Sequence, residues 1–247
     1  MPTIAEKRVF TQRDDVVQVL VASSMGVASV SLSGDIVGEF GIEHRCTARD
    51  VAAGGDALAV ATDEDVLVGD FAPTGHGPAV AVSVAGDGVL AAAPDGTVSL
   101  LAGDAEPAID AATPDGDAWE AVGTVDDPRR MDGRLVAAGD GVHRLRDGAL
   151  EYAGLEDARD VSDRGVPLAV TAGMLYTLGN GWMADLSGEA TERDDGFRCV
   201  VADSDGERAV AATDGAVYER ADATATEWTE HAEPGVVDAA FAGRHLV

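Results

Sequence analysis

The sequence predicts an all-β fold: a single six-bladed β-propeller over residues 1–247, closed by pairing the N- and C-terminal strands in one blade. Three observations predict it. A hairpin pattern recurs six times, its turns are spaced by about 38 residues on average, and each end of the chain carries an incomplete copy. Repeats of this period that lack helical periodicity are typical of propeller blades.

Each hairpin consists of two short apolar runs around a polar turn. The turn residue before the second run is glycine in five copies and aspartate in one, as expected if the turn requires a positive φ. The copies span 16–35, 57–70, 89–104, 134–148, 167–180 and 208–220, with turn residues Gly26, Asp65, Gly96, Gly141, Gly173 and Gly215.

A further short strand is expected beside each hairpin, and a weaker segment follows each, which gives about four strands per unit. These first strands are predicted at 48–56, 79–88, 118–127, 158–165, 198–206 and 235–243. The last one has no complete hairpin after it, and the first hairpin has no strand before it, so joining the ends completes the ring and removes an open edge. Two smaller β-sandwich domains are the alternative. No linker divides the chain, however, since the loop 103–117 falls inside a unit.

The composition is strongly acidic, with 45 Asp and Glu against 17 Lys and Arg and a net charge of −28. Lys7 is the only lysine, and the acids are spread evenly, which favours adaptation to a cytoplasm with molar salt, where repulsion is screened. An acidic surface for a basic partner is the alternative. The absence of a basic patch argues against nucleic acid. The polar N-terminus and the lack of a long apolar run predict a cytoplasmic protein that does not enter the membrane.

Two stretches carry a resemblance to a known family: ARDVAAGGDALAVATDEDVLVGD (48–70) and VVQVLVASSMGVASVSLSGDIVGEF (16–40). The chain resembles an uncharacterised haloarchaeal β-propeller-like domain family along essentially its whole length. The resemblance implies the propeller fold. It implies no activity and no catalytic residues.

Four carboxylates occupy one equivalent position when the six expected first strands are aligned. First strands line the central channel of a propeller, so these side chains are predicted to form a partial ring that could hold Ca²⁺ or Mg²⁺ or anchor a basic group. The alternative is that each carboxylate pairs with Arg49, Arg159 or backbone amides of the neighbouring blade, or simply faces water in the channel. The ring residues are Asp50, Glu120, Asp160 and Asp238; Ala81 and Val200 hold the position in the other two strands.

No motif for nucleophilic catalysis or phosphate binding is present, and no organic cofactor is expected. Cys46 and Cys199 are expected to be structural thiols. Arg49, Arg159 and Trp182 are candidate binding residues. The favoured function is a non-enzymatic binding or scaffold protein of a halophile, with a protein partner or small ligand at one rim of the disc. The alternatives are a metal-dependent hydrolase or lactonase-type propeller enzyme with a cation in the channel, and a structural assembly subunit.

Overall fold

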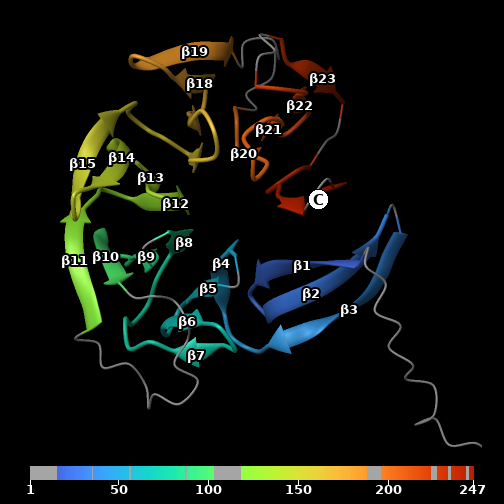
Figure 1. Ribbon diagram of the computed structural model, residues 1–247. Helices are drawn as coiled ribbons and strands as arrows, with labels where there is room; N and C mark the ends of the chain where they lie inside the picture. Colours follow the sequence, from blue (N-terminus) through green and yellow to red (C-terminus); the bar gives the residue numbers. More distant parts are fainter. Residues whose placement is uncertain are drawn as a thin grey trace, which may run out of the picture.

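The computed structural model describes residues 16–34, 36–55, 57–86, 88–102, 118–187, 196–223, 227–232, 235–242 and 245–247. The N-terminal residues 1–15 and the loop 103–117, on which parts of the sequence analysis depend, lie outside the described residues. The described chain forms antiparallel sheets arranged in a ring around a central axis (Figure 1). The predicted six-bladed β-propeller is confirmed.

We name the blades A to F in chain order. Blade A contains β1 (Val16–Ser23), β2 (Gly26–Ser33) and β3 (Ile36–His44). Blade B contains β4 (Ala48–Gly54), β5 (Ala57–Thr62), β6 (Val66–Val68) and β7 (Ala72–Pro73). Blade C contains β8 (Ala81–Ala85), β9 (Gly88–Ala92), β10 (Thr97–Ala102) and β11 (Trp119–Thr124).

The second half of the ring repeats this order. Blade D contains β12 (Pro128–Asp132), β13 (Leu135–Ala138), β14 (Gly141–Arg146) and β15 (Ala149–Gly154). Blade E contains β16 (Asp160–Ser162), β17 (Leu168–Val170), β18 (Met174–Leu178) and β19 (Trp182–Ser187). Blade F contains β20 (Cys199–Ala202), β21 (Ala209–Ala212), β22 (Val217–Arg220) and β23 (Thr229–His231).

The C-terminal segment lies beside β1, at the inner side of blade A, where the sequence predicts the closing strand. Its two short strands are β24 (Phe241–Ala242) and β25 (His245–Leu246), which pair with each other. Within the described residues the hydrogen-bonded sheet of blade A therefore has the order β1-β2-β3, whereas each of the other five blades has four strands.

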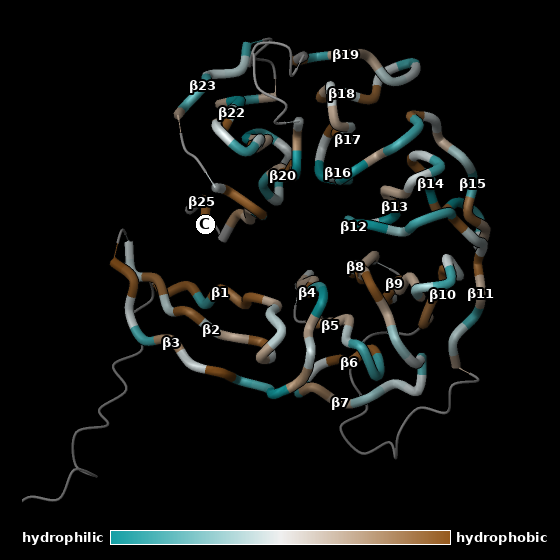
Figure 2. The backbone as a smooth tube through the Cα atoms, turned by 180° about the vertical axis from the view of Figure 1, so that it is seen from behind, coloured by the Kyte–Doolittle hydropathy of each residue, from teal (hydrophilic) through white to brown (hydrophobic). Residues whose placement is uncertain are grey.

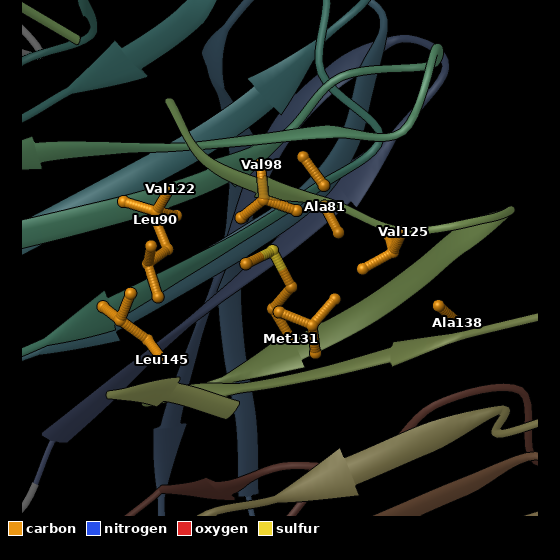
Figure 3. Packing of buried hydrophobic residues seen from close by; sticks show 10 residues of the cluster. Ala81, Leu90, Val98, Val122, Val125, Met131, Ala138 and Leu145 are labelled. Atoms are coloured by element: carbon orange, nitrogen blue, oxygen red, sulfur yellow. The ribbon is translucent and has the colours of Figure 1, made fainter. Parts of the chain in front are cut away.

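The core of the molecule lies between blades rather than within them. Separate clusters of buried Val, Ala and Leu side chains join A to B, B to C, C to D, D to E and E to F. At the C–D junction, Leu90 of blade C belongs to the same buried cluster as Met131 and Leu145 of blade D (Figure 3). Each fully buried Val or Leu contributes about 1.5–3 kcal/mol to folding. The described residues contain no such cluster between blade F and blade A.

Two details of the predicted strand pattern are wrong. The segment 118–127 contains β11, which pairs with β10 as the outer strand of blade C; the first strand of blade D is β12. In addition, only some turn glycines have a positive φ. Gly26 does (φ +132°), and a Cβ there would lie 2.0 Å from the carbonyl oxygen of His44. Gly173 and Gly215 do not, so their turns do not require glycine for that reason.

Candidate functional site

The predicted acidic residues on inner strands link one blade to the next. The carboxylate of Asp50 accepts a hydrogen bond from the backbone N–H of Val82 in the following blade, at 3.0 Å. Asp160 repeats this arrangement with the N–H of Val200, at 2.8 Å. The second oxygen of each carboxylate accepts the N–H of the next residue in its own strand. Both side chains therefore pair with a backbone amide of the neighbouring blade, which was the alternative to a cation-binding ring.

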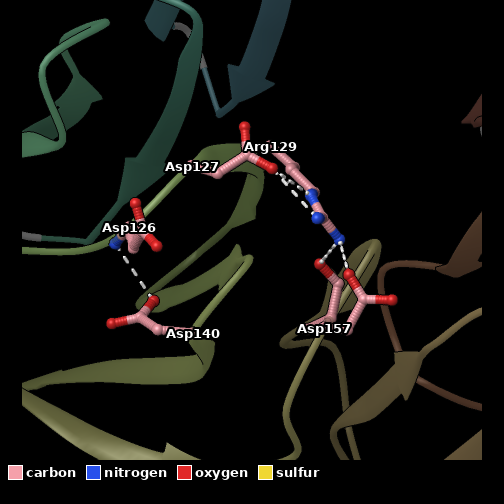
Figure 4. Close-up of polar contacts among 6 residues, drawn as sticks. Asp126, Asp127, Arg129, Asp140 and Asp157 are labelled. Atoms are coloured by element: carbon pink, nitrogen blue, oxygen red, sulfur yellow. Dashed lines mark hydrogen bonds and ion pairs between the residues drawn. The ribbon is translucent and has the colours of Figure 1, made fainter.

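The arginine side chains that come directly before the predicted ring residue in their strands also contact the neighbouring blade. Arg159 donates to the carbonyl oxygen of Phe197 at 2.9 Å, and Arg129 of β12 donates to that of Ala158 at 3.1 Å. Arg129 also forms ion pairs with Asp127 and Asp157 (Figure 4). Arg49, predicted as a binding residue, holds the same place in β4 and is exposed.

Arg130 faces the central channel. The predicted ring of carboxylates did not include this cationic side chain. Its guanidinium lies 3.5 Å from the carboxylate of Asp238, from the C-terminal segment. Burial opposes the charge of Arg130, but attraction to Asp50, Asp238 and Asp160 outweighs it and raises the arginine pKa. The channel therefore contains one guanidinium that interacts with three of the four predicted carboxylates.

Burial changes the acidity of the groups around this channel. Asp160 is 7% exposed, and desolvation raises its pKa to about 8, against the opposing effects of the Val200 N–H and Arg130. Desolvation likewise raises the pKa of Asp50 to about 6. The thiol of Cys199 is 3% exposed, and burial followed by repulsion from Asp160 raises its pKa to about 12. Such a thiol is a poor nucleophile, as expected for a structural cysteine.

The fourth predicted ring residue, Glu120, does not reach the channel. It lies on β11, the outer strand of blade C, and is exposed, so its placement on a first strand was wrong. The register of β12 puts Arg130 at that position, and the register of β20 puts Cys199 there instead of Val200. The sequence contains a signal for this arrangement: aligning PRRM (128–131) with ARDV (158–161) places Arg130 opposite Asp160.

These contacts bear on the predicted cation site. In the described parts of the chain, no group of three or more His, Cys, Asp and Glu side chains could hold a metal ion. A Ca²⁺ or Mg²⁺ in the channel would face the positive charge of Arg130, and the carboxylates of Asp50 and Asp160 already accept two backbone N–H groups each. The cation site stays a prediction that the geometry does not favour.

Trp182, the third predicted binding residue, joins two blades. Its indole N–H donates to the carbonyl oxygen of Ala153 at 2.9 Å, and its ring packs against the buried cluster between blades D and E. A half-buried indole in this arrangement contributes to blade packing.

A different part of the molecule carries the exposed apolar surface. Seven of the thirteen exposed large hydrophobic side chains among the described residues belong to blade A, and three more belong to the C-terminal segment beside it. Figure 2 shows the hydrophobic segments along β1, β2 and β3. The seven are Val16, Val21, Met25, Ile36, Val37, Phe40 and Ile42.

The strand register places most of these side chains on one face of blade A. Residues opposite each other in an antiparallel pair share a face. On β3, Val37, Phe40 and Ile42 are opposite Leu32, Val30 and Ala28 of β2, which in turn are opposite Val17, Val19 and Val21 of β1. We call these nine residues the blade A apolar face. The other face of blade A packs against blade B through Leu20, Ala22 and Val27.

The fold and these sites define a β-propeller whose inner strands are joined by charged side chains. Residues 3–247 match the model of the HVO_0234-like β-propeller family, and the chain belongs to that family. This supports the resemblance to a β-propeller family, while the haloarchaeal origin stays a prediction. A comparison with curated proteins finds no match. No helix in the described residues is long and apolar enough to cross a bilayer.

Several solved propellers have a similar fold. PorZ, a surface component of the type-IX secretion system of Porphyromonas gingivalis, has a TM-score of 0.57 at 16% identity, over 88% of this chain and 31% of that one. The extracellular domain of a putative one-component system from B. thetaiotaomicron has a TM-score of 0.54 at 13% identity, over 93% of this chain and 36% of that one. YCF48 bound to D1 peptide has a TM-score of 0.53 at 12% identity, over 87% of this chain and 77% of that one. The chain spans about a third of the first two, and these likenesses show the fold alone.

Proposed function

We propose that this protein is a non-enzymatic binding module that contacts a protein partner through the blade A apolar face. The observation that carries the proposal is the concentration of exposed hydrophobic side chains in one blade of six. Phe40 is 82% exposed and Val37 is 66% exposed. Together the exposed parts of this face come to an area on the order of several hundred Å², and patches of that size mark interaction surfaces on soluble proteins.

The rest of the described molecule supports a binding role over catalysis. Asp50 and Asp160 accept blade-to-blade hydrogen bonds, and both interact with Arg130, as does Asp238. The similar structures include the extracellular domain of a putative one-component system and YCF48 bound to D1 peptide. The peptide bound to YCF48 supports the proposal as an argument from fold.

The test is quantitative co-purification with wild-type protein and two variants. Phe40→Asp places a charge on the blade A apolar face. Tyr152→Asp makes the same charge change at a 59% exposed aromatic on β15 of blade D and is the matched control. We expect a stoichiometric partner to be lost with Phe40→Asp and retained with Tyr152→Asp, in dilute buffer and in molar KCl.

Two results would contradict the proposal. One is a partner retained equally by all three proteins, which would place the contact elsewhere. The other is a wild-type protein that is dimeric by light scattering and becomes monomeric only in Phe40→Asp, which would make the face a contact between two copies. Circular dichroism of both variants checks that the fold is intact.

A further inference from the structure

The outer edge of blade A differs from every other outer edge in the described molecule. β3 is nine residues long and ends its sheet, so among the described residues one row of its backbone N–H and C=O groups has no strand beside it. Eight of its nine residues are exposed. The outer strands of the other blades are shorter, and the six-residue strands β11, β15 and β19 each turn some side chains inward.

The side chains of β3 form a platform next to this free edge. Val37, Phe40 and Ile42 continue the blade A apolar face to the edge, so an added strand would gain apolar cross-strand neighbours as well as backbone hydrogen bonds. Gly41 leaves the backbone of β3 uncovered, since a Cβ there would have no neighbour within 4 Å, whereas a Cβ at Gly38 would lie 3.3 Å from the backbone of Ser31 on β2. Glycines in a strand commonly mark a place where another backbone approaches closely.

The charges of β3 select the kind of strand that fits. Glu39 and Glu43 are exposed on β3, and the whole chain carries −28. Like charges opposite each other destabilise a strand pair, whereas opposite charges stabilise it. A second copy of this chain would bring two acidic edges together, so a partner strand with Lys or Arg among apolar residues is favoured.

We infer that the partner contributes an extended segment, apolar and basic in alternation, that pairs with the free edge of β3. The inference rests on the proposed function and specifies how the partner is bound: main-chain hydrogen bonds to β3 supply affinity, and the apolar face with the glutamates supplies selectivity. It adds a strand to blade A on the side away from the channel.

The probe is a short synthetic peptide of alternating valine and lysine, followed by fluorescence anisotropy. Its control has the same side chains with alternate backbone nitrogens methylated, which preserves charge and prevents edge pairing. We expect the parent peptide to bind and the methylated one to bind at least about tenfold more weakly. Phe40→Asp should also weaken binding about tenfold although it adds a negative charge, and Tyr152→Asp should not.

Hydrogen exchange gives a second measurement on the unmodified protein. The amides of residues 36–44 should slow when the parent peptide binds, and those of β15 should not. Equal affinity of the two peptides, or no slowing in β3, would overturn strand addition. Strong protection of residues 36–44 in the free protein would also overturn it, because the edge would then be covered by the protein itself.

The two proposals fail separately. If Phe40→Asp leaves partner capture unchanged, the proposed function fails and strand addition fails with it. If Phe40→Asp removes the partner but the peptides do not discriminate, the apolar face is the contact site and the partner docks without adding a strand.

Discussion

Blade A and blade C are built from similar strands but have opposite surroundings. In blade C, β9 reads GVLAA and all five residues are buried, because blades B and D cover both faces of the sheet. In blade A, β1 reads VVQVLVAS and no residue is fully buried, because among the described residues the buried cluster on this sheet is the one shared with blade B. Apolar strands thus form core in one blade and exposed surface in the other. Burial is decided by the neighbouring blade.

The comparison also separates two surroundings for a carboxyl side chain. Between packed blades, the side chain of Asp160 crosses the junction and accepts the backbone N–H of Val200. On blade A, Glu39 is exposed on β3. A carboxyl group at a packed junction thus links two blades, while one at the open edge faces solvent.

The largest expected difference between the two regions concerns apolar truncation. Leu90 is fully buried at the C–D junction, and Leu90→Ala should lower the free energy of unfolding by about 2–5 kcal/mol through lost burial and a residual cavity. Phe40→Ala on β3 removes a larger side chain but should change the free energy of unfolding by no more than about 0.5 kcal/mol. Urea denaturation at fixed salt measures both. A comparable loss in Phe40→Ala would show that the apolar face is covered by the protein's own chain.

A glycine pair makes the same comparison for the backbone. Gly165 has φ +60°, and a Cβ there would lie 2.7 Å from the Cα of Gly206 at the E–F junction. Gly165→Ala should therefore destabilise the protein by about 1–3 kcal/mol through strain and overpacking. Gly41→Ala on β3 meets no atom within 4 Å and should change stability by less than about 0.5 kcal/mol. Equal effects in thermal unfolding would contradict the difference between the packed and open blades.

The sequence predicted the repeats well because turn residues and apolar runs are local signals. It failed where the local signal was misleading. The first strand of blade D reads PRRMD, with a proline and two arginines, whereas the outer strand WEAVGT of blade C is a better strand former. The sequence pattern therefore predicted the wrong strand, which placed Glu120 in the channel and left Arg130 unpredicted.

The exposed face of blade A could not be predicted for a different reason. Val19, Val30 and Phe40 lie in apolar strands like those that are buried in other blades, and their exposure depends on what packs against them in three dimensions. The sequence did allow the blade-linking role of Asp160, because pairing of a carboxylate with an amide of the neighbouring blade was the alternative to cation binding. Deciding between these two interpretations required the register of β20.

The last comparison concerns the pH dependence of stability. An aspartate in the unfolded chain has a pKa near 3.8, whereas burial raises the pKa of Asp160 in the folded protein to about 8. Between these values the unfolded chain has released the proton that the folded protein keeps, so raising the pH favours unfolding. The contribution of Asp160 to stability should therefore fall from about pH 4 to about pH 8 and stay low above that.

Asp160→Asn removes this titration while retaining a side-chain oxygen that can accept one N–H. Its unfolding midpoint should fall less steeply between pH 5 and pH 8 than that of the wild type, even if its absolute stability is lower. If Asp160→Asn and the wild type show the same slope, the buried carboxylate is ionised throughout, and its bonds to Val161 and Val200 together with Arg130 outweigh desolvation. The slope thus measures how strongly a packed junction holds the charge that crosses it.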